Sequence, residues 1–307
     1  MFTTIGGKPV SQFSFGTMQF GGNADEATSG EMYDTCRKAG INFFDTAHVY
    51  NGGRSEEITG RLVAAERDDV FVATKCASEG WDPATMRAEF DESRKRLGLE
   101  TVDLLYIHQW KSDQSLEDAL AVVGDYVKSG AVRYVGVSNF AAWKVMKARN
   151  IAREMGFDIQ FLQPMYNLVK RQAEVEVLPM AVSEGFSVCP YSPLGGGLLT
   201  GKYAAGVAGR LTADEAYKAR YAPDWMGQTA TDLAELAAVS GVSPATLAVA
   251  WVAKHAGVYG PIISARNAIQ LMPSLAAMKF EMDDALYAEV SALSQKPAPD
   301  NDRLEEP

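Results

Sequence analysis

The chain has 307 residues, of which 47% are hydrophobic, so it can bury a large core as one α/β barrel or as two smaller domains. Its formal net charge is -10 and it has no long run of Lys and Arg, which argues against nucleic-acid binding, because that binding needs clustered positive charge. The spacing of Cys36, Cys76 and Cys189 gives no disulfide framework, and the sequence has no signal-peptide pattern and no apolar run long enough to span a bilayer, so we expect a cytoplasmic protein without a membrane partner.

The chain begins with a predicted β-hairpin, in which residues 2–5 and 8–11 are strand-like and Gly6-Gly7 supplies the turn. Short apolar runs then alternate with helical patterns. Asp82-Pro83 and Ser243-Pro244 are typical of a helix N-cap followed by proline. A helical face with apolar residues three and four positions apart lies between residues 116 and 127. The predicted strands cover residues 13–15, 42–45, 70–75, 104–108, 132–138, 161–165, 187–191 and 260–263.

Eight strands that alternate with helices indicate a parallel sheet, and their number favours a single (β/α)₈ TIM barrel over residues 1–307. A doubly wound sheet is the alternative, although no G-x-G-x-x-G follows the first strand. Residues 201–230 are predicted to be a long loop between the seventh strand and the next helix, and a loop of that length is more often functional than idle. The acidic tail, residues 297–307, is predicted to be flexible.

Four side chains suited to acid–base chemistry fall at or just after successive strand ends. Asp45, Lys75 and His108 end the second, third and fourth strands, and Tyr50 follows in the loop after the second. A phenol has a free pKa of about 10, which a neighbouring ammonium lowers. A carboxylate would hold the ammonium and an imidazole would orient a carbonyl group. The sequence therefore predicts a site that moves a proton onto a carbonyl oxygen.

Each of these residues also has an ordinary structural explanation when taken alone. Asp45 could be a helix N-cap or a structural salt-bridge partner, Tyr50 a loop aromatic, Lys75 a surface lysine and His108 a hydrogen-bonded structural histidine. Their joint placement at matching strand ends favours catalysis. The three histidines lack metal-ligand spacing, so no metal is expected.

A glycine-rich stretch, residues 196–202, reads GGLLTGK and matches most of a phosphate-binding P-loop. Tyr203 stands where the motif needs Ser or Thr, and the stretch does not follow the first strand. We therefore interpret it as a glycine-rich turn after the seventh strand.

The sequence resembles the aldo-keto reductase superfamily over nearly its whole length. The resemblance rests on GINFFDTAHVYNGGRSEEITGRL (40–62), VFVATKC (70–76), VDLLYIHQW (102–110), SGAVRYVGVSNF (129–140), LQPMYNLVKR (162–171) and CPYSPLGGGLLTGKY (189–203). It implies a barrel in which Asp45, Tyr50, Lys75 and His108 form the catalytic tetrad and Tyr50 is the general acid in reduction.

The resemblance also implies NADP(H) bound across the strand ends. Ser138, Asn139 and Gln163 match residues that hydrogen-bond the nicotinamide carboxamide, and Tyr191 matches the aromatic residue that stacks on the nicotinamide ring. Ser192, Leu194 and Gly196 lie where the pyrophosphate would pass, and backbone amides of a glycine-rich loop suit phosphate oxygens.

Two departures from the family pattern concern the adenosine end of the cofactor. Pro273 and Ser274 replace an acidic residue and an asparagine that contact adenine, and Pro273 is expected to interrupt its helix. Gln270 replaces an arginine that many members place on the 2′-phosphate, which leaves Arg266 as the expected phosphate partner. NADP(H) is therefore the predicted cofactor, with NAD(H) as the alternative.

The predicted function is NADP(H)-dependent reduction of a small aldehyde or ketone. The alternatives are an NAD-dependent sugar or pyridoxal dehydrogenase on the same scaffold and a cofactor-binding regulatory subunit with little turnover. Trp110, two residues past His108, is a candidate wall of the substrate pocket, with rim packing as the alternative. The sequence does not indicate an oligomeric state or a particular substrate.

Overall fold

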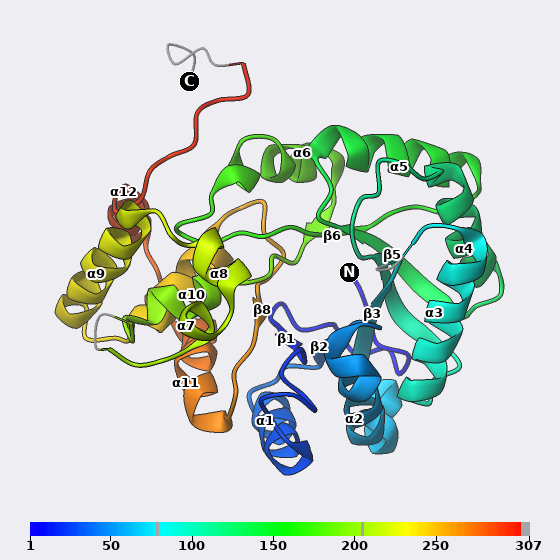
Figure 1. The fold of residues 1–307 in the computed structure, drawn as a ribbon, viewed down its shortest axis with the longest axis horizontal. Coiled ribbons are helices and arrows are strands. Elements are labelled where there is room, and N and C mark those ends of the chain that lie inside the picture. The colour runs from blue at the N-terminus through cyan, green and yellow to red at the C-terminus, as the bar shows by residue number, and fades with distance from the viewer. Residues whose placement is uncertain (78–79, 204–205, 302–307) are drawn as a thin grey trace.

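Eight parallel strands form one curled sheet in the computed structural model, which describes residues 1–77, 80–203 and 206–301 (Figure 1). The strand order is β7-β6-β5-β4-β3-β2-β1-β8, so each strand pairs with its neighbour in sequence and β8 pairs with β1. The predicted α/β class is confirmed. The strand order does not reverse direction, as it would in a doubly wound sheet. The strands are β1 Ser14–Gly16, β2 Phe43–Asp45, β3 Phe71–Cys76, β4 Val102–Ile107, β5 Val132–Ser138, β6 Phe161–Gln163, β7 Ser187–Val188 and β8 Ile262–Ile263.

Backbone hydrogen bonds also join the two outer strands, β7 and β8. The Tyr259 amide donates to the Val188 carbonyl at 2.8 Å, and the Ile262 amide donates to the Pro190 carbonyl at 2.9 Å. The sheet therefore curls until its two edges meet, which is consistent with the expected (β/α)₈ barrel.

Alternation along the strands separates two apolar cores. Phe71 and Ala73 of β3 point to the inside of the curled sheet, whereas Val72 between them packs against the helices. Leu104 and Tyr106 of β4 are inside in the same way. A strand has a side-chain period of two, so sequences that are apolar at every position serve both cores at once.

The predicted N-terminal hairpin is not confirmed as a pair of strands. Thr3 and Pro9 form a single antiparallel bridge, and Pro9 has no N–H with which to extend a ladder. The segment instead closes the end of the sheet interior where the strands begin. The Phe2 ring lies 4.3 Å from that of Phe161 and 5.1 Å from that of Tyr134.

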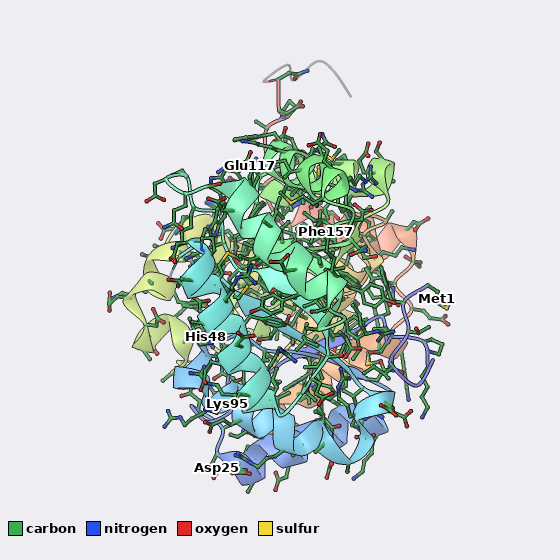
Figure 2. All side chains as sticks on the ribbon, turned by 90° about the vertical axis from the view of Figure 1, so that its right-hand side faces the viewer. Met1, Asp25, His48, Lys95, Glu117 and Phe157 are labelled. Atoms are coloured by element: carbon green, nitrogen blue, oxygen red, sulfur yellow. The ribbon has the colours of Figure 1, made fainter. Side chains whose placement is uncertain are left out.

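Helices surround the sheet, with α1 to α6 following one another around its outer face and α9 to α12 beyond β8 (Figure 1). Asp25, Lys95 and Glu117 lie on the solvent side of these helices (Figure 2). Both predicted proline-supported caps are confirmed, because Asp82 accepts from the Thr85 amide and Ser243 from the Ala245 amide. The longer helices are α1 Glu26–Lys38, α2 Arg54–Val63, α3 Pro83–Leu97, α4 Leu116–Lys128, α5 Ala142–Glu154, α6 Val177–Glu184, α9 Asp224–Val239, α10 Pro244–Lys254, α11 Ala268–Ala276 and α12 Asp284–Ala292. The 3-10 turns are η1 Tyr50–Gly53, η2 Ala64–Asp69, η3 Gln172–Glu174, η4 Gly195–Thr200 and η5 Ala277–Lys279.

Residues 201–230 are not the uninterrupted loop that the sequence predicted. They contain the short helices α7 Arg210–Ala213 and α8 Glu215–Arg220 and the start of α9. Arg210 and Arg220 both stack on the Tyr217 ring, at 4.7 and 4.8 Å from its centre. Helices this short have little periodicity for a sequence pattern to reveal. In the tail, residues 297–301 form no helix or strand, and residues 302–307 lie outside the described residues.

Pro273 does not interrupt its helix, contrary to expectation, because α11 continues through it. Proline removes the hydrogen bond to the carbonyl four residues earlier. That carbonyl belongs to Ile269, which is 84% exposed, so water can replace the missing donor.

Among the described residues, no single helix has the length and apolar character to cross a membrane. Taken together, α9 and α10 meet those criteria, by length and composition only, across a bend of 100°.

Candidate active site

A cavity of about 650 Å³ opens at the carboxyl ends of the strands. Parallel strands place their carboxyl ends at one edge, so residues far apart in sequence meet there. The cavity lining includes twelve of the residues predicted for the site: Asp45, Tyr50, His108, Ser138, Asn139, Gln163, Tyr191, Ser192, Leu194, Gly196, Arg266 and Gln270.

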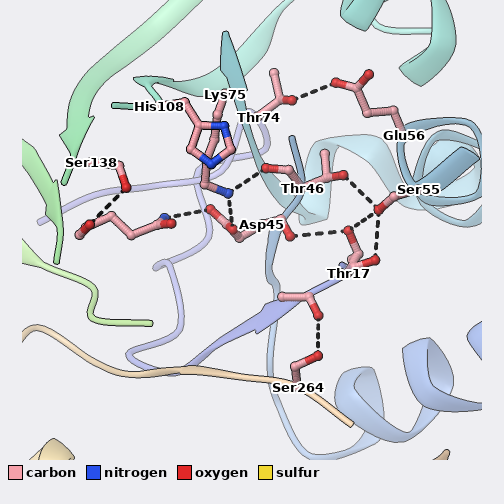
Figure 3. Close-up of polar contacts among 12 residues, drawn as sticks. Thr17, Asp45, Thr46, Ser55, Glu56, Thr74, Lys75, His108, Ser138 and Ser264 are labelled. Carbon is pink, nitrogen blue, oxygen red and sulfur yellow. Dashed lines mark hydrogen bonds and ion pairs between the residues drawn. The ribbon is translucent and has the colours of Figure 1, made fainter. Parts of the chain in front are cut away.

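Lys75 lies beneath the cavity floor and forms a buried ion pair with Asp45 (Figure 3). Its Nζ is 2.5 Å from Asp45 Oδ1 and 2.7 Å from the Thr46 carbonyl oxygen. Burial lowers the pKa of Lys75, but Asp45 and Tyr50 raise it, and the net pKa lies above its usual value. Lys75 is therefore a fixed ammonium. A buried pair of this kind needs further hydrogen bonds to offset its desolvation, and Thr46 supplies one.

Tyr50 stands beside this ammonium on η1, with Lys75 Nζ 5.0 Å from its ring centre. We expected Lys75 to lower the pKa of Tyr50. The net pKa is instead raised, because burial of the phenol outweighs the attraction of the Lys75 ammonium, although that attraction acts in the expected direction. The phenol therefore keeps its proton at neutral pH.

His108 faces the same part of the cavity, with its ring 6.1 Å from that of Tyr50 and nearly perpendicular to it. Burial, together with the nearby charge of Lys75, lowers the pKa of His108 to about 3. The imidazole is therefore neutral at physiological pH, with one N–H donor and one acceptor nitrogen. It can orient a polar substrate group without adding charge.

The residues predicted to hold the nicotinamide carboxamide are joined to one another and to the tetrad. Gln163 Nε2 donates to Asp45 Oδ2 at 2.9 Å, although we expected a ligand to satisfy this amide. Ser138 Oγ donates to the Gln163 carbonyl at 2.9 Å. Asn139 Nδ2 donates to the His108 carbonyl at 3.1 Å, and the Tyr191 hydroxyl donates to Asn139 Oδ1 at 2.8 Å.

The other half of the cavity combines a glycine-rich turn with cationic side chains. Gly196 and Gly197 have φ values of 66° and 94°, a left-handed backbone that favours glycine. Lys202, Arg210 and Arg266 line the same cavity. Within the described part of the chain no carboxylate forms an ion pair with any of these three cations, so their charge is available to a phosphate.

The lining fits an elongated, phosphate-bearing cofactor for a further reason. Ser274 is a buried residue of the cavity lining, and its hydroxyl has no hydrogen-bond partner among the described residues. Buried polar groups are normally satisfied, so an unpaired hydroxyl at a cavity wall points to a ligand that would pair with it.

Sequence reasoning missed several residues of the lining. Gln19 and Ser264 follow the first and eighth strands, so the strand-end rule that found the tetrad could have found them. Lys202 lies in the stretch interpreted only as a turn. Arg210 and Tyr217 come from the segment predicted to be a loop, where no sequence pattern marked them.

Trp110 lies outside the cavity lining, in an aromatic cluster at the rim. Its ring is 5.2 Å from those of Trp81 and Phe140 and 5.9 Å from that of Trp143. Lys144 Nζ lies 4.5 Å above it. Contact between Trp110 and a substrate therefore stays a prediction. Among the described residues, no three His, Cys, Asp or Glu side chains are grouped to hold a metal ion.

Comparison with known proteins places this geometry in a family context. Relatives include Uncharacterized oxidoreductase YrpG of Bacillus subtilis, 33% identical over 92% of both chains, and a probable voltage-gated potassium channel subunit beta of Oryza sativa, 32% identical over 89% of this chain and 88% of the relative. Norsolorinic acid reductase B of Aspergillus parasiticus is 35% identical over 61% of this chain and 56% of its own. The model of the Aldo/keto reductase family matches residues 12–295, and the chain belongs to that family.

Proposed function

We propose that this protein is an NADP(H)-dependent oxidoreductase that reduces an aldehyde or ketone, with Tyr50 as the general acid. One observation carries the proposal. A phenol that burial keeps protonated lies beside a buried Lys75–Asp45 ion pair and a neutral His108, at the wall of one cavity. We also propose that residues 1–307 form a single (β/α)₈ barrel. The protein would act in the cytoplasm on a small carbonyl compound.

The bound cofactor would supply a hydride to the carbonyl carbon. Tyr50 would donate its hydroxyl proton to the carbonyl oxygen, and the Lys75 ammonium would stabilise the phenolate that remains. Asp45 fixes that ammonium through the bond at 2.5 Å. His108 would hold the carbonyl oxygen with its N–H, so that the proton and the acceptor are aligned. A positioned general acid contributes typically about 10²- to 10⁴-fold to the rate.

The same lining would hold the cofactor. Ser138, Asn139 and Gln163 would hold the nicotinamide carboxamide. Gln163 bonds Asp45 through its amide nitrogen, and a primary amide has a second N–H to offer. The other proposed contacts are made by Tyr191 with the nicotinamide ring, by Ser192, Leu194 and Gly196 with the pyrophosphate, and by Arg266 and Gln270 with the 2′-phosphate.

The relatives support two functional classes. Several are named norsolorinic acid reductases, which favours the reductive direction. Two are named probable voltage-gated potassium channel subunits beta, which keeps a regulatory role with slow turnover as the second candidate. The arrangement of Asp45, Tyr50, Lys75 and His108 favours the enzyme.

The test is turnover of a generic aldehyde, 4-nitrobenzaldehyde, together with a panel of ketones, with NADPH and NADH in parallel. Tyr50→Phe should lose at least nine-tenths of the wild-type rate and keep its NADPH affinity, measured by tryptophan fluorescence. Tyr126→Phe is the matched control, because it removes another tyrosine hydroxyl, one that bonds Asp91 on the outer helices. A Tyr50→Phe variant above a tenth of the wild-type rate contradicts the assignment. A wild-type protein that binds NADPH but turns over none of the panel favours the regulatory role.

A further inference from the structure

The short turn that carries Tyr50 has an unusual backbone. Asn51, Gly52 and Gly53 have φ values of 52°, 64° and 92°, so three consecutive residues are left-handed. A non-glycine residue in this region is strained and persists only when the surroundings hold it. The bond from the Tyr50 amide to the Ala47 carbonyl lies within the turn itself and does not anchor it to the sheet.

The His48 amide, just before the turn, donates to the Lys75 carbonyl at 3.1 Å, and further contacts hold the turn from two sides. On the β1 side, Asn51 Nδ2 donates to the Met18 and Phe20 carbonyls, each at 2.8 Å. On the opposite side stands Arg96, from the last turn of α3. Its Nη1 donates to the His48 carbonyl at 3.1 Å, two residues before Tyr50.

Arg96 also packs directly against the end of the turn. A Cβ atom added to Gly53 would lie 2.5 Å from Arg96 Cζ, so a side chain there would displace the guanidinium. Gly53 is therefore needed for its left-handed backbone and for this close approach. The guanidinium spans the turn from His48 to Gly53, with Tyr50 between them.

Glu56 connects the guanidinium to the strand that carries Lys75. Its carboxylate is fully buried in the first turn of α2, where Oε2 is 3.4 Å from Arg96 Nη1. The other oxygen, Oε1, accepts a hydrogen bond of 2.7 Å from Thr74, the residue before Lys75 in β3 (Figure 3). Arg96, Glu56 and Thr74 thus form one chain from α3 through α2 to β3.

The neighbouring residue, Ser55, fixes the other partner of Lys75. Ser55 Oγ lies 2.9 Å from Thr46 Oγ1 and donates to the Thr17 carbonyl at 2.8 Å (Figure 3). Thr46 is the residue whose carbonyl binds the Lys75 ammonium. The first turn of α2 therefore holds both strands of the Asp45–Lys75 pair while Arg96 holds the turn that carries Tyr50.

We infer that Arg96 is a positioning residue that sets the distance between the Tyr50 phenol and the Lys75 ammonium through His48, Gly53 and Glu56. This inference rests on the proposed function, in which Tyr50 is the proton donor. Arg96 touches no reacting atom. Its loss would free the turn and move the phenol, and a displacement of about 1 Å at a reacting group can cost about 10²-fold in rate.

The experiment compares Arg96→Ala and Arg96→Lys in the full chain with a matched control, Arg149→Ala. Arg149 is also a largely buried arginine in an ion pair, 2.8 Å from Asp158, but it lies near the end of α5 and close to the start of β6, at the opposite end of the sheet from the cavity. The readouts are the single-turnover rate of NADPH oxidation with 4-nitrobenzaldehyde, the NADPH Kd from tryptophan fluorescence, and the melting temperature.

For Arg96→Ala we expect a rate about ten- to hundred-fold below that of the wild type, an unchanged NADPH Kd, and partial recovery of the rate by guanidinium ion at non-denaturing concentration. Arg96→Lys should retain more activity than Arg96→Ala, because an ammonium can still reach Glu56. Arg149→Ala should lower the melting temperature and keep the wild-type rate.

If Arg96→Ala does not fold, Glu56→Gln replaces it. The amide can still accept from Thr74 but no longer attracts the guanidinium, so the rate should fall without loss of NADPH affinity. A wild-type single-turnover rate in Arg96→Ala or in this substitute overturns the inference. So does a loss of rate that the fraction of unfolded protein at the assay temperature fully accounts for. Tyr50→Phe, measured in parallel, separates the two levels: an active Tyr50→Phe refutes the proposed function, whereas an inactive Tyr50→Phe with a wild-type Arg96→Ala refutes only the positioning role.

Discussion

The amide of Gln163 holds Oδ2 of Asp45 at 2.9 Å, while Lys75 holds Oδ1 of the same carboxylate at 2.5 Å. Both oxygens of a buried acid are therefore occupied, one by the tetrad and one by a residue proposed to bind the nicotinamide. The hydrogen bond from Gln163 lowers the pKa of Asp45 and opposes the larger effect of burial, which raises it. This amide would therefore link the proposed cofactor contact to the charge of Asp45.

Gln163→Leu should therefore affect both cofactor binding and chemistry. The substitution leaves one buried oxygen of Asp45 without a donor, and such an unsatisfied group costs about 1–3 kcal/mol. We expect a lower melting temperature, a weaker affinity for NADPH and a lower kcat. A variant in which only the NADPH affinity falls, with kcat and melting temperature intact, would show that this amide does not support Asp45.

Lys75→Met should slow both directions of the reaction. The ammonium opposes the effect of burial on Tyr50, so its removal raises the pKa of the phenol further. Alcohol oxidation needs the phenolate, and its pH profile should therefore move to higher pH or the activity disappear. Lys218→Met, which removes an exposed lysine of α8, is the control. The kcat of oxidation between neutral and alkaline pH is the measurement, and an unchanged profile would exclude coupling between Lys75 and Tyr50.

The gathering of Asp45, Lys75 and His108 at the strand ends was predictable because it depends on periodicity and spacing, which a sequence displays directly. The bounds of β5 and the cap at Asp82 follow from the same local rules. The net direction of the Tyr50 pKa could not be predicted, because it depends on how much burial opposes one charge. The partner of Gln163 could not be predicted either, since it depends on the curl that brings β6 across the sheet interior to β2.

Two of the predicted elements, the N-terminal hairpin and the loop at residues 201–230, differ in the structure. The hairpin was predicted from Gly6-Gly7, but Pro9 stops the ladder and the Phe2 ring gains more from packing against Phe161. The helices α7 and α8 span only residues 210–213 and 215–220, too short for a helical period to stand out in the sequence.

The neutral state of His108 predicts how stability and activity vary with pH. Its pKa is about 3 in the folded protein, against an ordinary value of about 6.5. Between these two values the unfolded chain binds more protons, so stability rises with pH and is lost as the pH falls from about 6.5 towards 3. His108→Gln has no imidazole to protonate and cannot lose stability in this way. Its melting temperature should therefore fall less than that of the wild type as the pH is lowered. The plot of reduction rate against pH should show no limb, that is, no titration step, near pH 6.5. A constant difference in melting temperature, or a limb removed by His108→Gln, would show that His108 titrates normally.

Cofactor choice should depend on Arg266. Arg266 and Gln270 line the cavity at the start of α11, where Asn267 caps the helix by accepting from the Gln270 amide at 2.9 Å. A hydrogen bond to a charged group contributes about 1.5–3 kcal/mol, or about ten- to hundred-fold in affinity, and the planar guanidinium suits phosphate oxygens. We therefore expect NADPH to be preferred over NADH.

Arg266→Ala should weaken NADPH more than NADH and bring the two cofactors together. Gln270→Arg should widen the gap, because it adds a second cation where the native amide carries no charge. Arg61→Ala is the matched control, since it removes one positive charge from an exposed pair with Glu26. The ratio of kcat/KM for the two cofactors, measured in all four proteins at one ionic strength, decides the matter, because screening by salt would otherwise mimic the effect. A wild-type preference for NADH would contradict the prediction. A ratio that Arg266→Ala leaves unchanged while Arg61→Ala alters it would mean that long-range charge and not Arg266 determines the preference.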